Sequence, residues 1–241
     1  MCWCVCSNSA LAEHPSDAVV NVVADDDEVM ELLVQDGDWS SLKTERAHLT
    51  NQVVDAYLEL LQAHLKSDSG VVVLNTSYWN VLNGVDEGRF QTVLLPAFKK
   101  KHEKQTTRIL WAVHGFGHFA VLDILVKECR IDVYDSIKKC SKLWVPDSNC
   151  RLQQLLCNVF PGKNHKKATF AVKYPQCRQQ VNSDDCGVYA MANVRSLLFK
   201  RAINGNGMPG SHLGENRPVA VMALRKKFLA EFSSKKLSKW W

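Results

Sequence analysis

Cys186 is the residue with the clearest potential for chemistry, and it lies in the segment QVNSDDCGVYA, residues 180–190. Polar residues precede it, and an apolar stretch typical of a helix follows it. The N–H groups and the dipole of a helix N-terminus favour an anion, so a cysteine there can be a thiolate near neutral pH. Gly187 has no side chain to block the sulfur, and the amide of Gln180 could donate to an oxyanion. The segment therefore predicts a nucleophilic cysteine with its oxyanion hole.

A base and an acid that orients it are predicted in a β-hairpin, where two apolar runs flank a short polar break. His118 begins the first run and Asp135 follows the second, so both lie at the open end of the hairpin. A turn centred near Val126 and Lys127 would place them directly opposite each other, whereas a turn nearer Glu128 would offset them by a few residues. In either register the carboxylate would fix the imidazole tautomer, and the imidazole would take the thiol proton.

Other residues compete for these roles. The alternatives are His102 and His114 as bases, Asp123 and Asp132 as acids, and Gln179 as the oxyanion donor. We expect both alternative acids at the surface or in a turn. A cysteine beside apolar residues is usually a buried core thiol, but the polar residues before Cys186 and the glycine after it favour a nucleophile.

The order His, Asp, Gln, Cys, with Asp135 seventeen positions after His118 and Gln180 six before Cys186, resembles the ubiquitin-like-protein-specific cysteine protease family. That family includes SUMO- and NEDD8-deconjugating enzymes and, distantly, adenovirus-type proteases. The resemblance extends over roughly residues 40–235. Its further segments are HLTNQVVDAYLELL (48–61), VVVLNTSYWNVL (71–82) and AVHGFGHFAVLDI (112–124).

The resemblance implies an α+β, papain-like cysteine protease fold, in which helices flank a mixed, mostly antiparallel sheet and the nucleophile begins a helix. It implies cleavage after the C-terminal glycine of a ubiquitin-like modifier, with no cofactor and no metal. The implied catalytic residues are His118, Asp135, Gln180 and Cys186. The implied substrate-binding residues are His48, Leu49, Asn51, Phe119 and Gly187.

The chain departs from the family where two tryptophans form a narrow tunnel over the Gly-Gly tail of the substrate. Phe119 and His48 stand at those two positions, and Thr50 and Asn51 replace an Asn-Asp pair. We expect Phe119 to serve as a platform for the substrate and the tunnel to be wider and less apolar. An acetyltransferase of the same clan and a catalytically weak module that binds a modifier are the alternative functions.

The composition is that of one globular domain: 241 residues, 46% hydrophobic and 23% charged. No apolar run approaches the roughly 20 residues of a membrane span, and the N-terminal residues lack the basic region and apolar core of a secretory signal. Nine cysteines without such a signal favour a reducing compartment. We therefore expect a monomer in the nucleus or cytoplasm with no membrane partner.

Charge is distributed unevenly along the chain. Residues 1–42 hold nine of the 25 acidic residues and none of the 30 basic ones, so the remainder has 16 acidic residues and a net charge of +14. The densest basic clusters are residues 99–101 and 163–167. They suit an acidic protein partner or nucleic acid, although nothing further supports nucleic acid, and a solvated surface explains them equally well.

We expect residues 1–38 to form a flexible acidic leader and residues 39–241 to form the catalytic domain. Cys2, Cys4 and Cys6 in the leader suggest a metal site or palmitoylation, but an unstructured segment is favoured because no second cysteine pair matches them. The expected strands are 71–74, 108–113, 118–126, 131–134 and 168–173. The expected helices are 51–66, 75–83, 147–160, 186–202 and 217–232, with Asn75 or Thr76 as the cap of the second and Asp184 or Asp185 as the cap of the fourth.

Overall fold

The structure is a computed structural model, which describes residues 36–66, 68–84, 87–102, 106–137, 140–143, 145, 150–160, 169–199 and 218–238. Residues 31–241 form one compact unit. Most of the predicted leader, with Cys2, Cys4 and Cys6, lies outside the described residues, as does the basic cluster at 163–167. Helix α1 begins at Asp36, three residues before the expected start of the domain. Among the described residues, no helix has the length and hydropathy needed to span a membrane.

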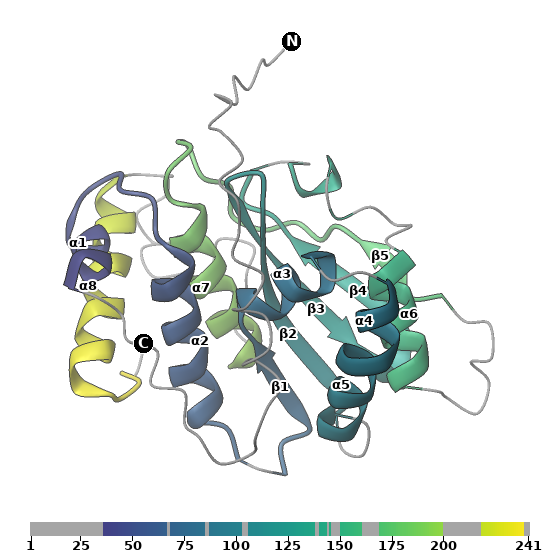
Figure 1. Cartoon of the computed structure of the whole chain (residues 1–241). Helices are drawn as coiled ribbons and strands as arrows, with labels where there is room; N and C mark the ends of the chain where they lie inside the picture. The colour runs from purple at the N-terminus through teal and green to yellow at the C-terminus, as the bar shows by residue number, and fades with distance from the viewer. Residues whose placement is uncertain are drawn as a thin grey trace. The chain divides into compact units, whose positions relative to one another are not determined.

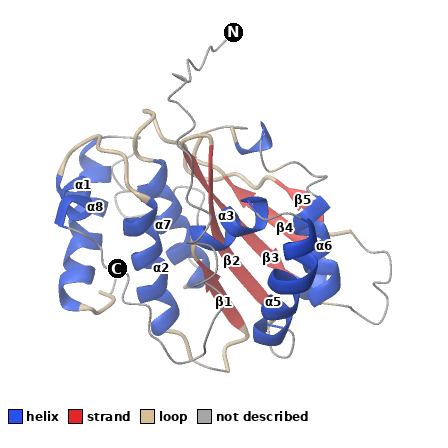
Figure 2. Ribbon diagram, viewed as in Figure 1, coloured by secondary structure: helices blue, strands red, loops and turns tan. Residues whose placement is uncertain are grey.

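The described strands form one mixed sheet in the order β1-β2-β3-β4-β5 (Figure 1). The strands are β1 (Val71–Leu74), β2 (Arg108–Gly115), β3 (His118–Leu125), β4 (Arg130–Tyr134) and β5 (Ala171–Lys173). The long central pairs β2–β3 and β3–β4 are antiparallel, whereas the short outer pairs β1–β2 and β4–β5 are parallel. Together with the helices on both faces, this sheet confirms the α+β prediction (Figure 2).

Two helical layers cover the sheet (Figure 2). The helices are α1 (Asp36–Lys43), α2 (Asn51–Ala63), α3 (Thr76–Gly84), α4 (Glu87–Arg89), α5 (Leu95–His102), α6 (Cys150–Val159), α7 (Cys186–Leu198) and α8 (Pro218–Ser234), with a π-helical segment at Phe90–Leu94. Alternation along β2 explains the layers, because Leu110 and Ala112 join the core beneath α2 and α7, while Trp111 packs on Trp79 of α3 and Phe98 of α5. The helical stretch from 87 to 102 was not predicted.

Helix α7 is the central helix of the fold. Its residues 186–197 are all buried, since it packs against β2 and β3 on one side and against α2 and α8 on the other (Figure 1). A helix that is apolar around most of its circumference is stable only inside a core. Its N-terminus, where Cys186 lies, is therefore held by packing along its whole length.

Buried polar contacts join the helices to one another. Asp55 of α2 caps α3, because its carboxylate accepts hydrogen bonds from the backbone N–H of Thr76 at 2.7 Å and from the Thr76 hydroxyl at 2.8 Å. Burial raises the pKa of Asp55, although these hydrogen bonds oppose the shift. The expected caps, Asn75 and Thr76, are thus replaced by a side chain from another helix.

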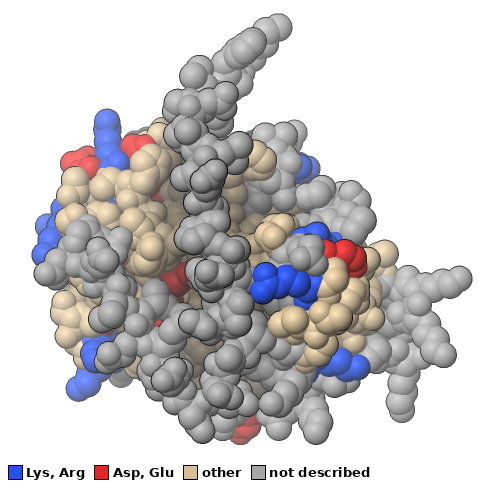
Figure 3. All heavy atoms as spheres, viewed as in Figure 1, with Lys and Arg blue, Asp and Glu red and all other residues tan. Residues whose placement is uncertain are grey.

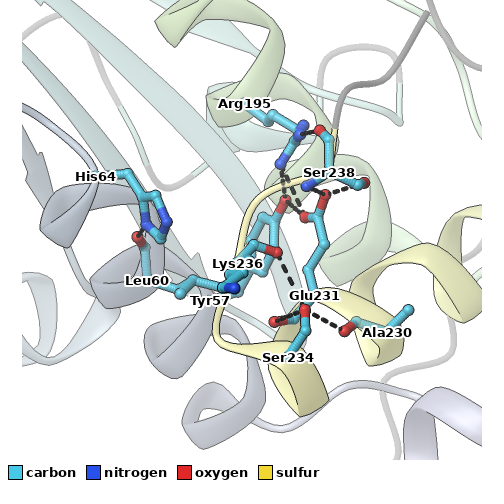
Figure 4. Close-up of polar contacts among 9 residues, drawn as sticks. All are labelled: Tyr57, Leu60, His64, Arg195, Ala230, Glu231, Ser234, Lys236 and Ser238. Atoms are coloured by element: carbon cyan, nitrogen blue, oxygen red, sulfur yellow. Dashed lines mark hydrogen bonds and ion pairs between the residues drawn. The ribbon is translucent and has the colours of Figure 1, made fainter.

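A second buried cluster joins α2, α7 and α8 (Figure 4). Arg195 of α7 donates to the Tyr57 hydroxyl at 2.9 Å and to the Glu231 carboxylate at 2.8 Å, and Tyr57 donates to the same carboxylate oxygen at 2.8 Å. The other oxygen of Glu231 accepts from the backbone N–H of Ser238 at 2.8 Å. We call these four residues the Arg195 cluster; it fastens the C-terminal segment to the body of the domain.

Two hairpin turns place the strands that carry the predicted base and acid. In the β3–β4 hairpin Val121 pairs with Tyr134, so Ala120 aligns with Asp135, and His118 is offset from Asp135 by two residues. The turn is centred nearer Glu128, where a 3-10 turn is followed by Cys129 in the left-handed conformation. Of the two registers considered from the sequence, the offset one is present.

The β2–β3 hairpin closes through the two residues Phe116 and Gly117, whose φ angles are 51° and 71°. Positive φ at both central positions is the pattern of a type I′ turn, in which Asn-Gly is the preferred pair. A bulky side chain rarely adopts this conformation. Phe116 is also 81% exposed, so its ring gains little from burial.

We predict that Phe116→Asn raises the free energy of unfolding by about 1 kcal/mol, because Asn tolerates the left-handed conformation that Phe resists. For a chain of this size, that gain corresponds to a rise of about 2–4 °C in Tm, measurable by thermal unfolding. Phe116→Ala is the matched control, since it removes the ring without favouring positive φ. Equal Tm values for the two variants would show that the turn conformation is not the cause.

Candidate active site

The fold brings together residues that the sequence predicted as catalytic. Cys186 is the first residue of α7, His118 is the first residue of β3, and Asp135 follows the last residue of β4. Gln180 lies in the loop that leads into α7, and its backbone N–H donates to the carbonyl of Ser136 at 2.8 Å. One end of the sheet and the N-terminus of α7 thus form a candidate active site.

Asp135 holds one nitrogen of the His118 ring. The distance from His118 Nε2 to Asp135 Oδ1 is 2.7 Å, and both side chains are buried. The carboxylate also accepts hydrogen bonds from the backbone N–H groups of Ile137 at 2.9 Å and Ser141 at 2.7 Å. Burial alone would raise the pKa of Asp135, but the hydrogen bonds from His118, Ser141 and Ile137 outweigh it and lower the pKa. Asp135 is therefore an ionised, fixed acceptor.

The other nitrogen, His118 Nδ1, has no hydrogen-bond partner among the described residues. Burial lowers the pKa of His118, whereas its hydrogen bond with Asp135 and its interaction with the neighbouring Cys186 raise the pKa, to about 9. An imidazole with this pKa is protonated at neutral pH. His118 is thus an imidazolium that binds the carboxylate through Nε2 and leaves Nδ1 for the neighbouring Cys186.

The geometry separates the candidate base from its competitors. His114 is stacked on Phe119, with ring centroids 4.4 Å apart, and burial and the charge of His118 both lower its pKa. His102 is the last residue of α5. Among the described residues, His118 is the histidine that contacts Asp135.

The two alternative acids are also distinguished by their positions. Asp123 and Asp132 were expected at the surface or in a turn, and this expectation was wrong, since they are buried opposite each other on β3 and β4. Arg108 neutralises Asp123 through two hydrogen bonds of 2.7 and 2.8 Å, which allows the carboxylate to be buried. This ion pair is a structural feature of the sheet.

Gln180 is held from both sides. The Ser136 hydroxyl donates to Gln180 Oε1 at 2.6 Å, and Gln180 Nε2 donates to the carbonyl of Asn182 at 2.6 Å. An amide nitrogen has two N–H groups, so one remains for a substrate oxygen. The competing Gln179 donates to the carbonyl of Asp135 at 2.8 Å. Ser136, which directly follows Asp135, therefore links the acid segment to the amide, and sequence reasoning missed it.

The N-terminus of α7 is not capped in the expected way. Asp185 occupies the N-cap position, but its carboxylate makes no capping hydrogen bond to the helix. Instead, it accepts from Arg225 of α8 at 2.6 Å and from Asn182 at 2.7 Å. The first N–H groups of a helix have no acceptor within the helix, so those of α7 stay available for an anion at Cys186.

The predicted substrate-binding residues fall into two places. His48 and Leu49 lie in the segment before α2, where His48 Nε2 is 3.2 Å from Asp184 Oδ1. A Cβ atom at Gly187 would come within 3.0 Å of Leu49 Cβ. Leu49 therefore occupies the space that the absent side chain leaves, so close packing also accounts for this glycine. Asn51 is the first residue of α2.

Phe119 was predicted to be a platform for the substrate, but its side chain is buried. It is 4% exposed and belongs to the core beneath α7, because alternation along β3 turns it toward that face. Its ring packs on His114 rather than forming a surface. Among the described residues, Phe116 and Val181 are exposed apolar side chains close in sequence to candidate catalytic residues: Phe116 lies two positions before His118, and Val181 directly follows Gln180.

Charged side chains are interspersed on the face drawn in Figure 3. Described Lys and Arg residues lie in separate groups there, several of them next to Asp or Glu. Among the described residues, no three His, Cys, Asp or Glu side chains are grouped as a metal site requires.

Comparisons with known proteins identify the family and the fold of the chain. Residues 47–207 match the model of the Ulp1 protease family, C-terminal catalytic domain. Among solved structures, the yeast C-terminal Ulp1 protease domain in complex with Smt3, the yeast ortholog of SUMO, is similar with a TM-score of 0.63 and 18% identity over 95% of this chain and 99% of that one.

Two further structures show the same fold. Ulp1 with its catalytic cysteine oxidized to a sulfenic acid has a TM-score of 0.64 and 16% identity over 95% of this chain and 100% of that one. The Chaetomium thermophilum Ulp1-like SUMO protease catalytic domain has a TM-score of 0.55 and 16% identity over 78% and 74%. No curated protein matched the sequence. Because the family match spans more than half of its 241 residues, the chain belongs to the Ulp1 protease family, a family of cysteine proteases.

Proposed function

We propose that this chain is a cysteine isopeptidase or endopeptidase in which Cys186 is the nucleophile, His118 the base, Asp135 its orienting acid and Gln180 an oxyanion donor. The observation that carries the proposal is the 2.7 Å contact between His118 Nε2 and Asp135 Oδ1. It leaves Nδ1 for a thiol at the N-terminus of a buried helix. Sequence position, geometry and family membership all support the same four residues.

The reaction follows from these groups. The thiolate of Cys186 attacks the substrate carbonyl, a C–S bond forms, and the carbonyl oxygen gains negative charge. The second N–H of Gln180 and the backbone N–H of Cys186 stabilise that oxyanion. His118 gives its proton to the leaving amine and then accepts one from the water that hydrolyses the thioester. Asp135 keeps the ring in place throughout.

The substrate proposed is a ubiquitin-like modifier of SUMO type, cleaved after its C-terminal glycine. The similar Ulp1 domain bound to Smt3, the yeast ortholog of SUMO, supports this class. The segment with His48 and Leu49 lies against the nucleophile segment. It is therefore placed to cover the extended C-terminal tail of a bound modifier. With His48 and Phe119 at the positions of two family tryptophans, we expect weaker selection for Gly-Gly than in relatives with both indoles.

We predict that wild-type protein cleaves C-terminally extended SUMO precursors and that Cys186→Ala abolishes cleavage without loss of the fold. Alanine is a good helix former and the lost sulfur is small. Turnover and Tm are measured on the same preparation. Residual turnover above about a thousandth of wild type would contradict the assignment, because removal of the nucleophile removes the covalent route.

A second prediction concerns pH. His118, with its pKa raised to about 9, holds its proton below that pH and loses it as the pH rises through that value. Proton donation to the leaving amine then fails, so kcat/KM should fall above pH 9. Asp135→Asn removes a negative charge that raises the pKa, and the fall should therefore begin at lower pH. Profiles of kcat/KM against pH for both proteins test this; coincident basic limbs would contradict it.

A third prediction concerns the oxyanion. Gln180→Ala should lower kcat by about 10²–10³-fold, the range for one lost donor, with little change in KM. Ser136→Ala is a milder variant for comparison, because it keeps the Gln180 amide but removes the hydroxyl that orients it. Its kcat should therefore fall less than that of Gln180→Ala. An effect of Gln180→Ala confined to KM would reassign the amide to substrate binding.

A further inference from the structure

Arg225 of α8 is the most completely buried charged side chain near the candidate active site, with 0% of its surface exposed. Its guanidinium donates to the Asp185 carboxylate at 2.6 Å, to the carbonyl of Ala47 at 2.7 Å and to the carbonyl of Ser41 at 2.6 Å. These acceptors come from three separate parts of the chain. Arg225 itself lies beyond residue 207, where the match to the family model ends.

Two of the acceptors lie next to residues of the proposed mechanism. Asp185 directly precedes Cys186, and Ala47 directly precedes His48. A single planar guanidinium therefore fixes the distance between the segment that carries the nucleophile and the segment that carries His48 and Leu49. Both hydrogen bonds come from the same terminal nitrogen, Nη2, whose two N–H groups reach the two acceptors at once while Nη1 binds Ser41.

Neighbouring contacts keep the same two segments together. His48 lies 3.2 Å from Asp184, and Leu49 packs on Gly187 so closely that an added Cβ would come within 3.0 Å. Three pairs of residues thus join the two segments: Ala47 and Asp185 through Arg225, His48 and Asp184 directly, and Leu49 and Gly187 by packing. These contacts fix the position of residues 47–49, which would line the proposed substrate channel, relative to the nucleophile segment.

The hydrogen bonding of Arg225 also carries a cost that packing alone does not explain. Its buried Nε has no hydrogen-bond partner in the described part of the chain, and an unpaired buried donor is unfavourable. The carboxylate of Asp185, drawn toward Arg225, makes no capping bond to α7. The fold tolerates both unfavourable features and keeps the bonds from Arg225 to Asp185 and to Ala47.

We propose that Arg225 is a positioning residue of the active site: it acts through Asp185 and the carbonyl of Ala47 to hold the nucleophile and the substrate-binding segment in register. The inference rests on the proposed function. It extends that function by making helix α8 part of the catalytic unit. Arg225 touches neither the thiol nor a reacting atom, so its effect is on geometry.

The Arg195 cluster supplies a matched control (Figure 4). Arg195 is also buried and also pairs with a carboxylate, and its hydrogen-bond partners include Glu231, Tyr57 and Ser238. None of these residues adjoins the nucleophile or the segment with His48. Arg195→Met should therefore lower Tm and leave kcat/KM of the folded protein within about twofold of wild type.

Arg225→Met should lower kcat/KM on a SUMO precursor by about 10²-fold at a temperature where both variants are folded, since displacements near 1 Å at reacting groups have effects of this size. Arg225→Lys keeps the charge but not the fork, and should recover part of the loss. Asp185→Asn should resemble Arg225→Met, and the double variant should be no worse than either, because both act on one contact. If Arg225→Met fails to fold, Arg225→Lys and Asp185→Asn carry the test.

A readout without turnover separates this inference from the proposed function. The rate at which iodoacetamide alkylates Cys186, resolved by mass spectrometry, should change at least fivefold in Arg225→Met or Arg225→Lys and remain at the wild-type value in Arg195→Met. If wild type cleaves no modifier, the proposed function fails while this comparison still stands. Equal alkylation rates and equal kcat/KM for the Arg225 and Arg195 variants would overturn the inference and leave Arg225 as a structural residue.

Discussion

The rest of the site depends on the buried N-terminus of α7. A helix start inside a core has N–H groups without partners and a positive field, and here the residue in the N-cap position turns its carboxylate away from them. Asn182 and Arg225 take up the carboxylate of Asp185. The N-terminal N–H groups of α7 are thus not used by this carboxylate, which leaves them for the thiolate and then for the substrate oxyanion of the proposed reaction.

The surrounding elements supply what this helix start requires. The sheet brings His118 and Asp135 to the same end of the fold, and the loop after β5 brings Gln180. Ser136, which directly follows Asp135, binds Gln180 through a side-chain hydrogen bond of 2.6 Å and a backbone hydrogen bond of 2.8 Å. His118, Asp135 and Gln180 are therefore linked by hydrogen bonds, as preorganised electrostatic stabilisation requires.

Much of this arrangement could be predicted from the sequence because its signals are local. Two apolar runs around a short polar break predicted β3 and β4, and the polar-to-apolar change at Cys186 predicted the start of α7. Contacts between distant segments were beyond such reasoning. Asp185 was expected to cap its own helix but binds an arginine 40 positions later, and Asp123 was expected outside the core but is neutralised by Arg108. The burial of Phe119 likewise depends on which face of the sheet α7 covers.

Covalent capture of Cys186 is the most direct measurement of the central claim, that this thiol is a nucleophile activated by His118. A SUMO protein whose C-terminal glycine carries a vinyl sulfone is incubated with wild type, Cys186→Ala and His118→Ala, and the products are mapped by mass spectrometry. The account predicts one adduct, on Cys186 alone, absent from Cys186→Ala and formed at least a hundredfold more slowly in His118→Ala. An adduct on another thiol, or reversible binding without any adduct, would contradict it.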